Sequence, residues 1–130
     1  MNAVDLLLKM DRGKVKAIPT KEVEVKRLSG IAGQPFKVRL KAVPGDTWND
    51  IAGTIKGADD AANYRSSKHL LLSGMVDPDL RNHDLQEAYV AASPLDLMEK
   101  LFLCGEIMNL AAEVTDLSGF GGDPEEEVKN

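Results

Sequence analysis

The sequence predicts an α+β fold, in which a small antiparallel β element near the N-terminus, over residues 21 to 42, is followed by a mainly helical bundle. Residues 21–26 and 36–42 alternate polar and apolar side chains, which is the period of a half-buried strand. After Pro44 the apolar residues recur at helical spacing instead. This change of period is the main indication that the sheet comes first and the helices pack on it.

Length and composition indicate one ordinary globular unit. A chain of 130 residues suits a single domain, since compact domains have about 50 to 250 residues. Its hydrophobic share of 43% and charged share of 28% are typical of such domains. We therefore expect residues 1–130 to form one domain, in which residues 1–14 and 121–130 are mobile.

The two predicted strands match best as an antiparallel pair. Placing Val25 opposite Val38 and Val23 opposite Leu40 puts the apolar residues on one face. The same register sets acidic residues of the first strand against basic residues of the second. Residues 29–35 contain two glycines and a proline, so we expect a long hairpin loop there.

Apolar spacing and capping residues predict one short helix before the strands and about five helices after them. A short helix is expected over residues 3–10, and the chain is expected to leave it at residues 11–13. Thr47, with Asp50 three residues later, is the expected cap of the next helix. A further helix is predicted over residues 58–73, with Gly74 as its stop.

The second half of the chain continues in helices after a turn-like connector at residues 75–80. Asn82 is expected to cap a short helix. Ser93 followed by Pro94 is the strongest helix start in the chain, because serine caps and proline suits the first helical position. We expect Gly105 to stop or kink that helix, and residues 118–122 to end its continuation.

The net charge of −5 conceals an asymmetry along the chain. Residues 1–45 hold ten basic and four acidic residues, whereas residues 46–130 hold six and seventeen. Solvated faces, complementary surfaces used in self-association and a nucleic-acid-binding end all fit this pattern. A single cysteine and the lack of an apolar run of about 18 residues predict no internal disulfide and no membrane association, hence a cytoplasmic protein.

The residues that could carry catalysis or bind a metal are few. His69, His83 and Cys104 lack the spacing of a zinc site, so no metal and no cofactor are expected. Residues 77–82 open like a calcium loop, but Arg81 stands at a ligand position. An enzyme would require the two histidines and the cysteine to meet in one pocket.

Two surfaces could bind a macromolecular partner. Lys37, Arg39 and Lys41 share one strand face and could follow a phosphate backbone, although no stacking aromatic accompanies them. The apolar stripe of the late helices could form a groove for a partner helix, or it could be core. The residues of this predicted partner surface are Leu97, Leu101, Phe102, Ile107, Leu110, Val114 and Leu117.

Four segments of the second half of the chain stand out together: LLLSGMVDPDL at residues 70–80, DLQEAY at 84–89, SPLDLMEKLFLCGEI at 93–107 and LSGF at 117–120. In order and spacing they resemble the XkdN-like tail-assembly chaperones of long-tailed bacteriophages. The resemblance extends over roughly residues 20 to 120, and Cys104 departs from the proline that is usual in that family.

The resemblance implies a non-enzymatic phage or prophage protein of the bacterial host cytoplasm. Such chaperones are thought to bind the tape-measure protein, which is long, helical and prone to aggregate, and to recruit tail-tube subunits around it. Self-association of copies along the client would fit the charge asymmetry. A small nucleic-acid-binding module that uses the basic strand face is the alternative.

Overall fold

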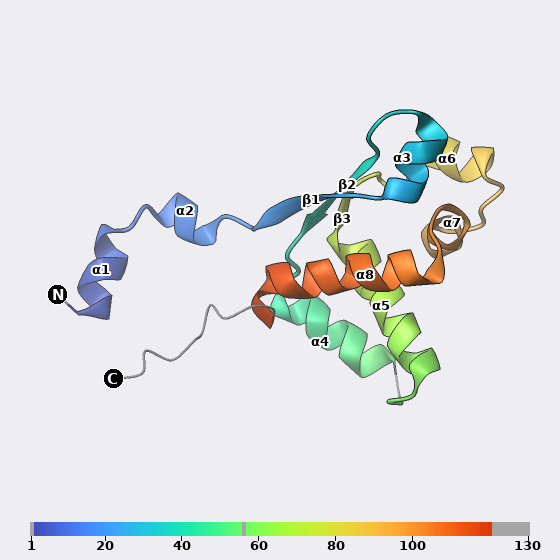
Figure 1. Cartoon of the computed structure of the whole chain (residues 1–130). Helices are drawn as coiled ribbons and strands as arrows, with labels where there is room; N and C mark the ends of the chain where they lie inside the picture. The colour runs from blue at the N-terminus through green and yellow to red at the C-terminus, as the bar shows by residue number, and fades with distance from the viewer. Residues whose placement is uncertain (1, 56, 121–130) are drawn as a thin grey trace.

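The fold is that of a three-stranded antiparallel sheet covered on one face by helices. The computed structural model describes residues 2–55 and 57–120. Figure 1 shows the sheet above a layer of helices, with a separate N-terminal segment. In chain order the elements are α1 (Ala3–Lys9), α2 (Arg12–Lys16), β1 (Thr20–Glu24), α3 (Lys26–Ala32), β2 (Lys37–Lys41), α4 (Gly45–Thr54), α5 (Asp60–Gly74), β3 (Met75–Asp77), α6 (His83–Ala88), α7 (Pro94–Leu101), α8 (Cys104–Thr115) and the single-turn π-helix η1 (Asp116–Phe120).

The sheet has the order β1-β2-β3, so β2 is the central strand. Both neighbours run antiparallel to it. Along β2 burial alternates, because Val38 and Leu40 point to the core while Lys37 and Arg39 point to solvent. This alternation confirms the predicted half-buried strand and the α+β class.

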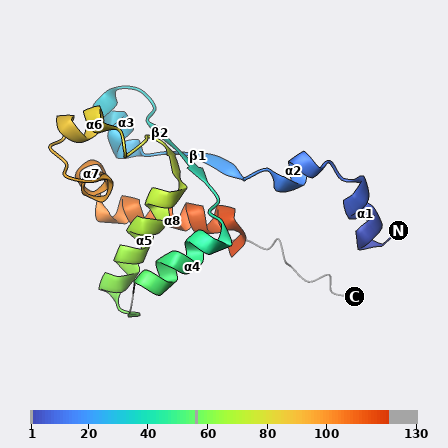
Figure 2. The ribbon, with the colours of Figure 1, turned by 180° about the vertical axis from the view of Figure 1, so that it is seen from behind.

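The core lies between the sheet and the pair α5 and α8, which pack against each other. Figures 1 and 2 show these two helices crossing below the sheet, with α4 against α5. The side chains with no exposed surface include Leu71 of α5 and Ile107 of α8. Completely buried leucine and isoleucine side chains each contribute about 1.5 to 3 kcal/mol relative to exposure, so this cluster dominates the stability.

The N-terminal arm, which we define as residues 2–18, stands apart from this body. Neither α1 nor α2 has a buried residue, and both views show the arm extending away from the sheet. The predicted helix over residues 3–10 is confirmed. Helix α2 was not predicted, since Gly13 there favoured a turn; Asp11 caps it by accepting a hydrogen bond from the Gly13 amide at 2.9 Å.

The register of the predicted hairpin was wrong by two residues. Val23, and not Val25, lies opposite Val38. Val25 instead caps α3, which occupies most of the predicted loop, and its amide donates to the Phe36 carbonyl at 3.0 Å. A shift of two keeps both the apolar face and the opposed charges, so the sequence pattern could not distinguish the two registers.

The predicted turn at residues 75–80 also contains an unpredicted element, β3. Three residues are too few for a pattern, and pairing with β2 defines the strand.

Helix α4 begins earlier than expected, after Pro44 and without a side-chain cap, so Thr47 is not the cap. Gly74 is not a stop either: it is the buried last residue of α5, packed so closely on α8 that an added Cβ would lie 2.7 Å from Val114.

The caps expected in the second half are confirmed. Asn82 accepts a hydrogen bond from the Leu85 amide at 2.9 Å, and Ser93 accepts one from the Asp96 amide at 3.1 Å. The expected break lies at Phe102, whose backbone is extended, three residues before Gly105. The last helix ends near Gly119 at a φ of 98°, while Gly121 and Gly122 lie outside the described residues.

Candidate partner-binding groove

An apolar groove opens at the end of the molecule where α3, α6 and α7 converge. Its volume is about 340 Å³. Leu28, Phe36 and Leu85 are half-buried at its base and pack on the core, whereas the Ile31 side chain is 74% exposed. We call this the α3–α6 groove, and its lining residues are Leu28, Ile31, Ala32, Phe36, Pro78, Leu85, Tyr89 and Leu101.

The wall formed by α3 depends on one serine. The Ser29 hydroxyl accepts a hydrogen bond from the Phe36 amide and donates one to Glu24, both at 2.8 Å. Gly33 ends the helix at a φ of 73°, which a residue without Cβ adopts at no steric cost. These contacts hold Ile31 and Phe36 on the two sides of a tight turn, so that both reach the groove.

The opposite wall is α6 and the residues that flank it. Gln86 donates a hydrogen bond to the Leu80 carbonyl at 2.8 Å, which closes the helix onto its own connector. Tyr89 follows α6 directly and is 48% exposed. Leu80 is buried, so the wall is anchored in the core although most of α6 is exposed.

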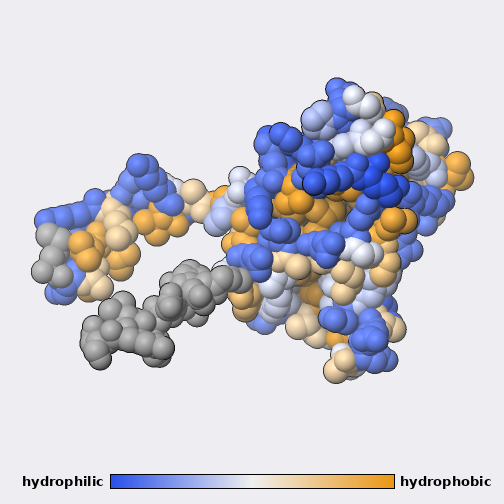
Figure 3. Space-filling view, in the orientation of Figure 1, coloured by the Kyte–Doolittle hydropathy of each residue, from blue (hydrophilic) through white to orange (hydrophobic). Residues whose placement is uncertain are grey.

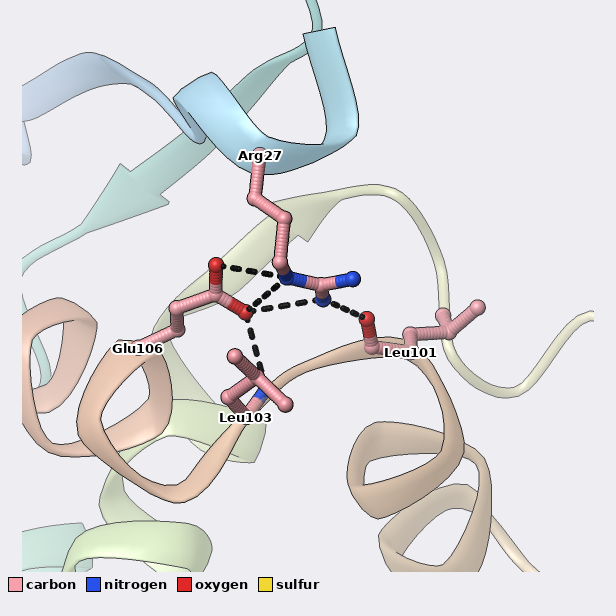
Figure 4. A network of polar contacts seen from close by, with 4 residues as sticks. All are labelled: Arg27, Leu101, Leu103 and Glu106. Atoms are coloured by element: carbon pink, nitrogen blue, oxygen red, sulfur yellow. Dashed lines mark hydrogen bonds and ion pairs between the residues drawn. The ribbon is translucent and has the colours of Figure 1, made fainter. Parts of the chain in front are cut away.

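Arg27 fixes α3 to the junction between α7 and α8 (Figure 4). Its guanidinium donates to both carboxylate oxygens of Glu106, at 2.9 and 3.0 Å, and to the Leu101 carbonyl at 2.8 Å. Glu106 also accepts from the Leu103 amide at 2.8 Å. The hydrogen bond from Arg27 is the main cause that lowers the pKa of the Glu106 carboxyl. We call these contacts the Arg27 clamp.

Acidic side chains lie in the connector before α6 and on α6 itself, close in the sequence to the groove residues Pro78 and Leu85. Four exposed carboxylates and one exposed cation lie between residues 77 and 88, which gives a local charge of −3. Such a rim favours a basic or amphipathic partner over an acidic one. The residues of this acidic rim are Asp77, Asp79, Arg81, Asp84 and Glu87.

The structure assigns most of the predicted partner surface to the core. Leu97, Phe102, Ile107, Leu110 and Val114 are each at most 3% exposed. The sequence had left two alternatives open for the apolar stripe of the late helices, a partner groove or core, and these five residues are core. The two remaining residues, Leu101 and Leu117, are half-buried, and only Leu101 lines the α3–α6 groove.

Sequence reasoning missed the rest of the groove because it comes from three segments far apart in the chain. A prediction of α3 was needed to place Ile31 near Tyr89, and the glycines of that segment suggested a loop. An amphipathic reading of residues 26–32, in which Leu28, Ile31 and Ala32 share one side, was the available signal.

Comparison with known proteins identifies the family. A model described as "Phage XkdN-like tail assembly chaperone protein, TAC" matches residues 4–130. The chain belongs to this family of phage tail assembly chaperones. The description of this family names proteins that assist the assembly of phage tails.

The chain is also similar to one curated protein and, in fold, to one solved structure. The phage-like element PBSX protein XkdN of Bacillus subtilis (strain 168) is 32% identical over 82 residues, which are 60% of this chain. That match covers 53% of the relative, so the chain spans about half the length of the curated protein it matches. The crystal structure of the protein YqbN has the same fold, with a TM-score of 0.61 and 22% identity over 82% of this chain and 92% of YqbN.

The groups considered for catalysis in this chaperone lie on different helices. His69 is half-buried on α5, whereas His83 on α6 and Cys104 on α8 are exposed. Within residues 2–55 and 57–120, no three His, Cys, Asp or Glu side chains are grouped so that they could hold a metal ion. In the same part of the chain, no helix is long and apolar enough to cross a membrane.

The basic strand face of the chaperone is interrupted by acids. Lys37 pairs with Glu24, and Arg39 lies between Glu22 on one side and Asp77 on the other. Residues paired in an antiparallel sheet share a face, so carboxylates stand between the cations. A phosphate backbone needs a continuous positive track, which this face does not provide.

Proposed function

We propose that this chaperone binds an apolar helical segment of the tape-measure protein in the α3–α6 groove and helps to recruit tail-tube subunits to it inside the bacterial host cell. The family supports a tail protein as client. The observation that carries the proposal is the groove itself: an apolar concavity between helices, rimmed by polar residues, is how proteins bind amphipathic helices.

The chemistry of the groove suits a client of this kind. A long helical protein presents repeated apolar stripes that associate with one another in water. Covering one stripe with Ile31 and Tyr89, which are exposed without a client, removes apolar surface of both proteins from water. The acidic rim then remains outside and keeps the complex soluble.

The test is co-expression with the tape-measure protein, followed by size-exclusion chromatography with light scattering. The natural chain is expected to keep the client soluble and to elute with it. Ile31→Asp places a charge in the groove and is expected to reduce the recovered complex at least tenfold. Val90→Asp is the matched control, because Val90 is 80% exposed and does not line the groove.

Two results would contradict the proposal. Equal recovery of complex with Ile31→Asp and the natural chain would exclude the groove as the client site. An insoluble tape-measure protein, with this chain eluting alone, would exclude that client. The tail-tube protein would then be tested as the partner by the same assay.

A further inference from the structure

We propose that the N-terminal arm of one copy occupies the α3–α6 groove of a second copy, and that the client must displace it. The proposal joins two surfaces whose apolar side chains are exposed within residues 2–55 and 57–120. One is the groove, and the other is the arm. The displacement by client rests on the function proposed above, whereas the contact between arm and groove does not.

The arm carries the features of a groove-binding helix. In α1, Val4, Leu7 and Leu8 have the spacing i, i+3 and i+4, and they are 63%, 56% and 62% exposed. Three side chains at this spacing form one stripe along a helix. An apolar stripe with no buried side chain is typical of a segment that binds elsewhere.

Charge complements this apolar match. The arm holds four cations and two carboxylates, a charge of +2. The acidic rim beside the groove has a charge of −3. Attraction between the two orients the arm and disfavours pairing of two arms or of two rims. The cations of the arm are Lys9, Arg12, Lys14 and Lys16.

The positions of the arm and the groove in the fold favour the arm of a second copy as the occupant of the groove. Both ribbon views show the arm leaving the body on the side opposite to α3 and α6. The chain after the arm is held to the sheet, since the Ala42 amide donates to the Pro19 carbonyl at 3.0 Å. Figure 3 shows apolar atoms on the arm, set off from the surface of the body. An arm on one side and a groove on the other link copies head to tail.

The test uses full-length chains with one of the two surfaces damaged. The arm variant is Leu7→Asp with Leu8→Asp, and the groove variant is Ile31→Asp. All three positions are exposed, so neither variant is expected to lose stability. Light scattering is expected to show a mass that rises with concentration for the natural chain and a monomer for each variant alone.

Mixing the two variants gives the decisive result. The groove variant still has an intact arm and the arm variant an intact groove, so the mixture is expected to form a 1:1 pair that does not grow further. Leu7→Met with Leu8→Met keeps the apolar stripe and is expected to associate like the natural chain. Val90→Asp is the matched control for the groove.

Three outcomes would overturn the contact between arm and groove: a natural chain that stays monomeric at every concentration, variants that associate like the natural chain, or a mixture that stays monomeric. Client binding is measured separately with the arm variant. If that variant binds client at least as well as the natural chain, displacement is supported; if client binds the natural chain without separating the copies, displacement is wrong. Failure of both the natural chain and the arm variant to bind client would refute the proposed function and leave the mass measurements valid.

Discussion

Gly74 shows how a single residue sets the distance between the two central helices. A Cβ at this position would lie 2.7 Å from both methyl carbons of Val114 and 3.0 Å from the Lys41 carbonyl oxygen. The lack of a side chain therefore lets α5 approach α8 and the end of β2 together. The residue that sequence reasoning assigned to the end of a helix is instead the point of closest packing.

Gly74→Ala is expected to lower the free energy of unfolding by about 1 to 3 kcal/mol, because an overpacked core must shift. Chemical denaturation monitored by circular dichroism measures this change. Gly53→Ala is the control: nothing lies within 4 Å of its added Cβ, so alanine in α4 is expected to raise the stability by about 0.5 to 1 kcal/mol. A Gly74→Ala protein as stable as the natural one would contradict the packing argument.

Glu106 is expected to make stability depend on pH. Its pKa in the folded protein lies below the usual 4.5, chiefly because Arg27 donates to its carboxylate. The unfolded chain therefore binds the proton more tightly, so the ionised carboxylate stabilises the fold above about pH 4.5. This contribution is lost as the pH falls through the lower, folded pKa.

Glu106→Gln is accordingly expected to have a lower melting temperature than the natural protein at pH 7. The difference in melting temperature is expected to shrink as the pH falls below 4.5. Thermal melts from pH 7 to pH 3 measure it. Glu87→Gln, an exposed carboxylate outside the Arg27 clamp, is the control. A difference that stays constant over this range would show that the ionised form of Glu106 adds nothing.

Helix α3 depends on contacts made far away in the chain. It has seven residues and no buried side chain, and short helices are marginal in isolation. Its attachments are the Arg27 clamp, the Ser29 turn and partial burial of Leu28. The groove wall is therefore only as stable as these few contacts.

Arg27→Ala is expected to increase hydrogen exchange in α3 and at the junction after Leu101, while α5 keeps its protection. The reason is that α5 is held by the core and α3 by the clamp. Exchange followed by mass spectrometry after short labelling times distinguishes the two helices. Lys26→Ala, the exposed neighbour, is the control, and unchanged exchange in α3 would show that the clamp does not hold it.

The elements that the sequence predicted well are those whose signals are local. Ser93 and Pro94 start α7, and alternation identified β2, because a cap or a period of two is complete within a few residues. The sequence did not predict helix α3 and strand β3, for the opposite reason. Both elements are short, and they form by pairing or packing with segments that are distant in the chain. Because the groove is built on α3, most of the candidate site was beyond sequence reasoning for the same reason.

At the scale of the whole molecule, we expect the free energy of unfolding of the body to be independent of the arm. No residue of the arm is buried, so its removal costs no core contact. We expect a chain without residues 2–18 to unfold within about 2 °C of the natural chain at low concentration, since changes away from the core cost at most about 0.5 kcal/mol.

Calorimetry at concentrations where both chains are monomeric measures this. Deletion of the arm is expected to abolish the rise of mass with concentration as well. A melting temperature lowered by 5 °C or more would show that the arm belongs to the folded body.

Among the long helices that the structure describes, α8 leaves the ribosome last, whereas β1 is made more than 80 residues earlier. Lys21 of β1 pairs with Glu113 of α8 across 92 residues, and Arg27 reaches Glu106 across 79. During translation the inner face of the β1–β2 pair therefore stays partly uncovered until α8 has been synthesised. Synthesis that stalls before residue 104 leaves an open sheet, which invites degradation or pairing with other nascent chains.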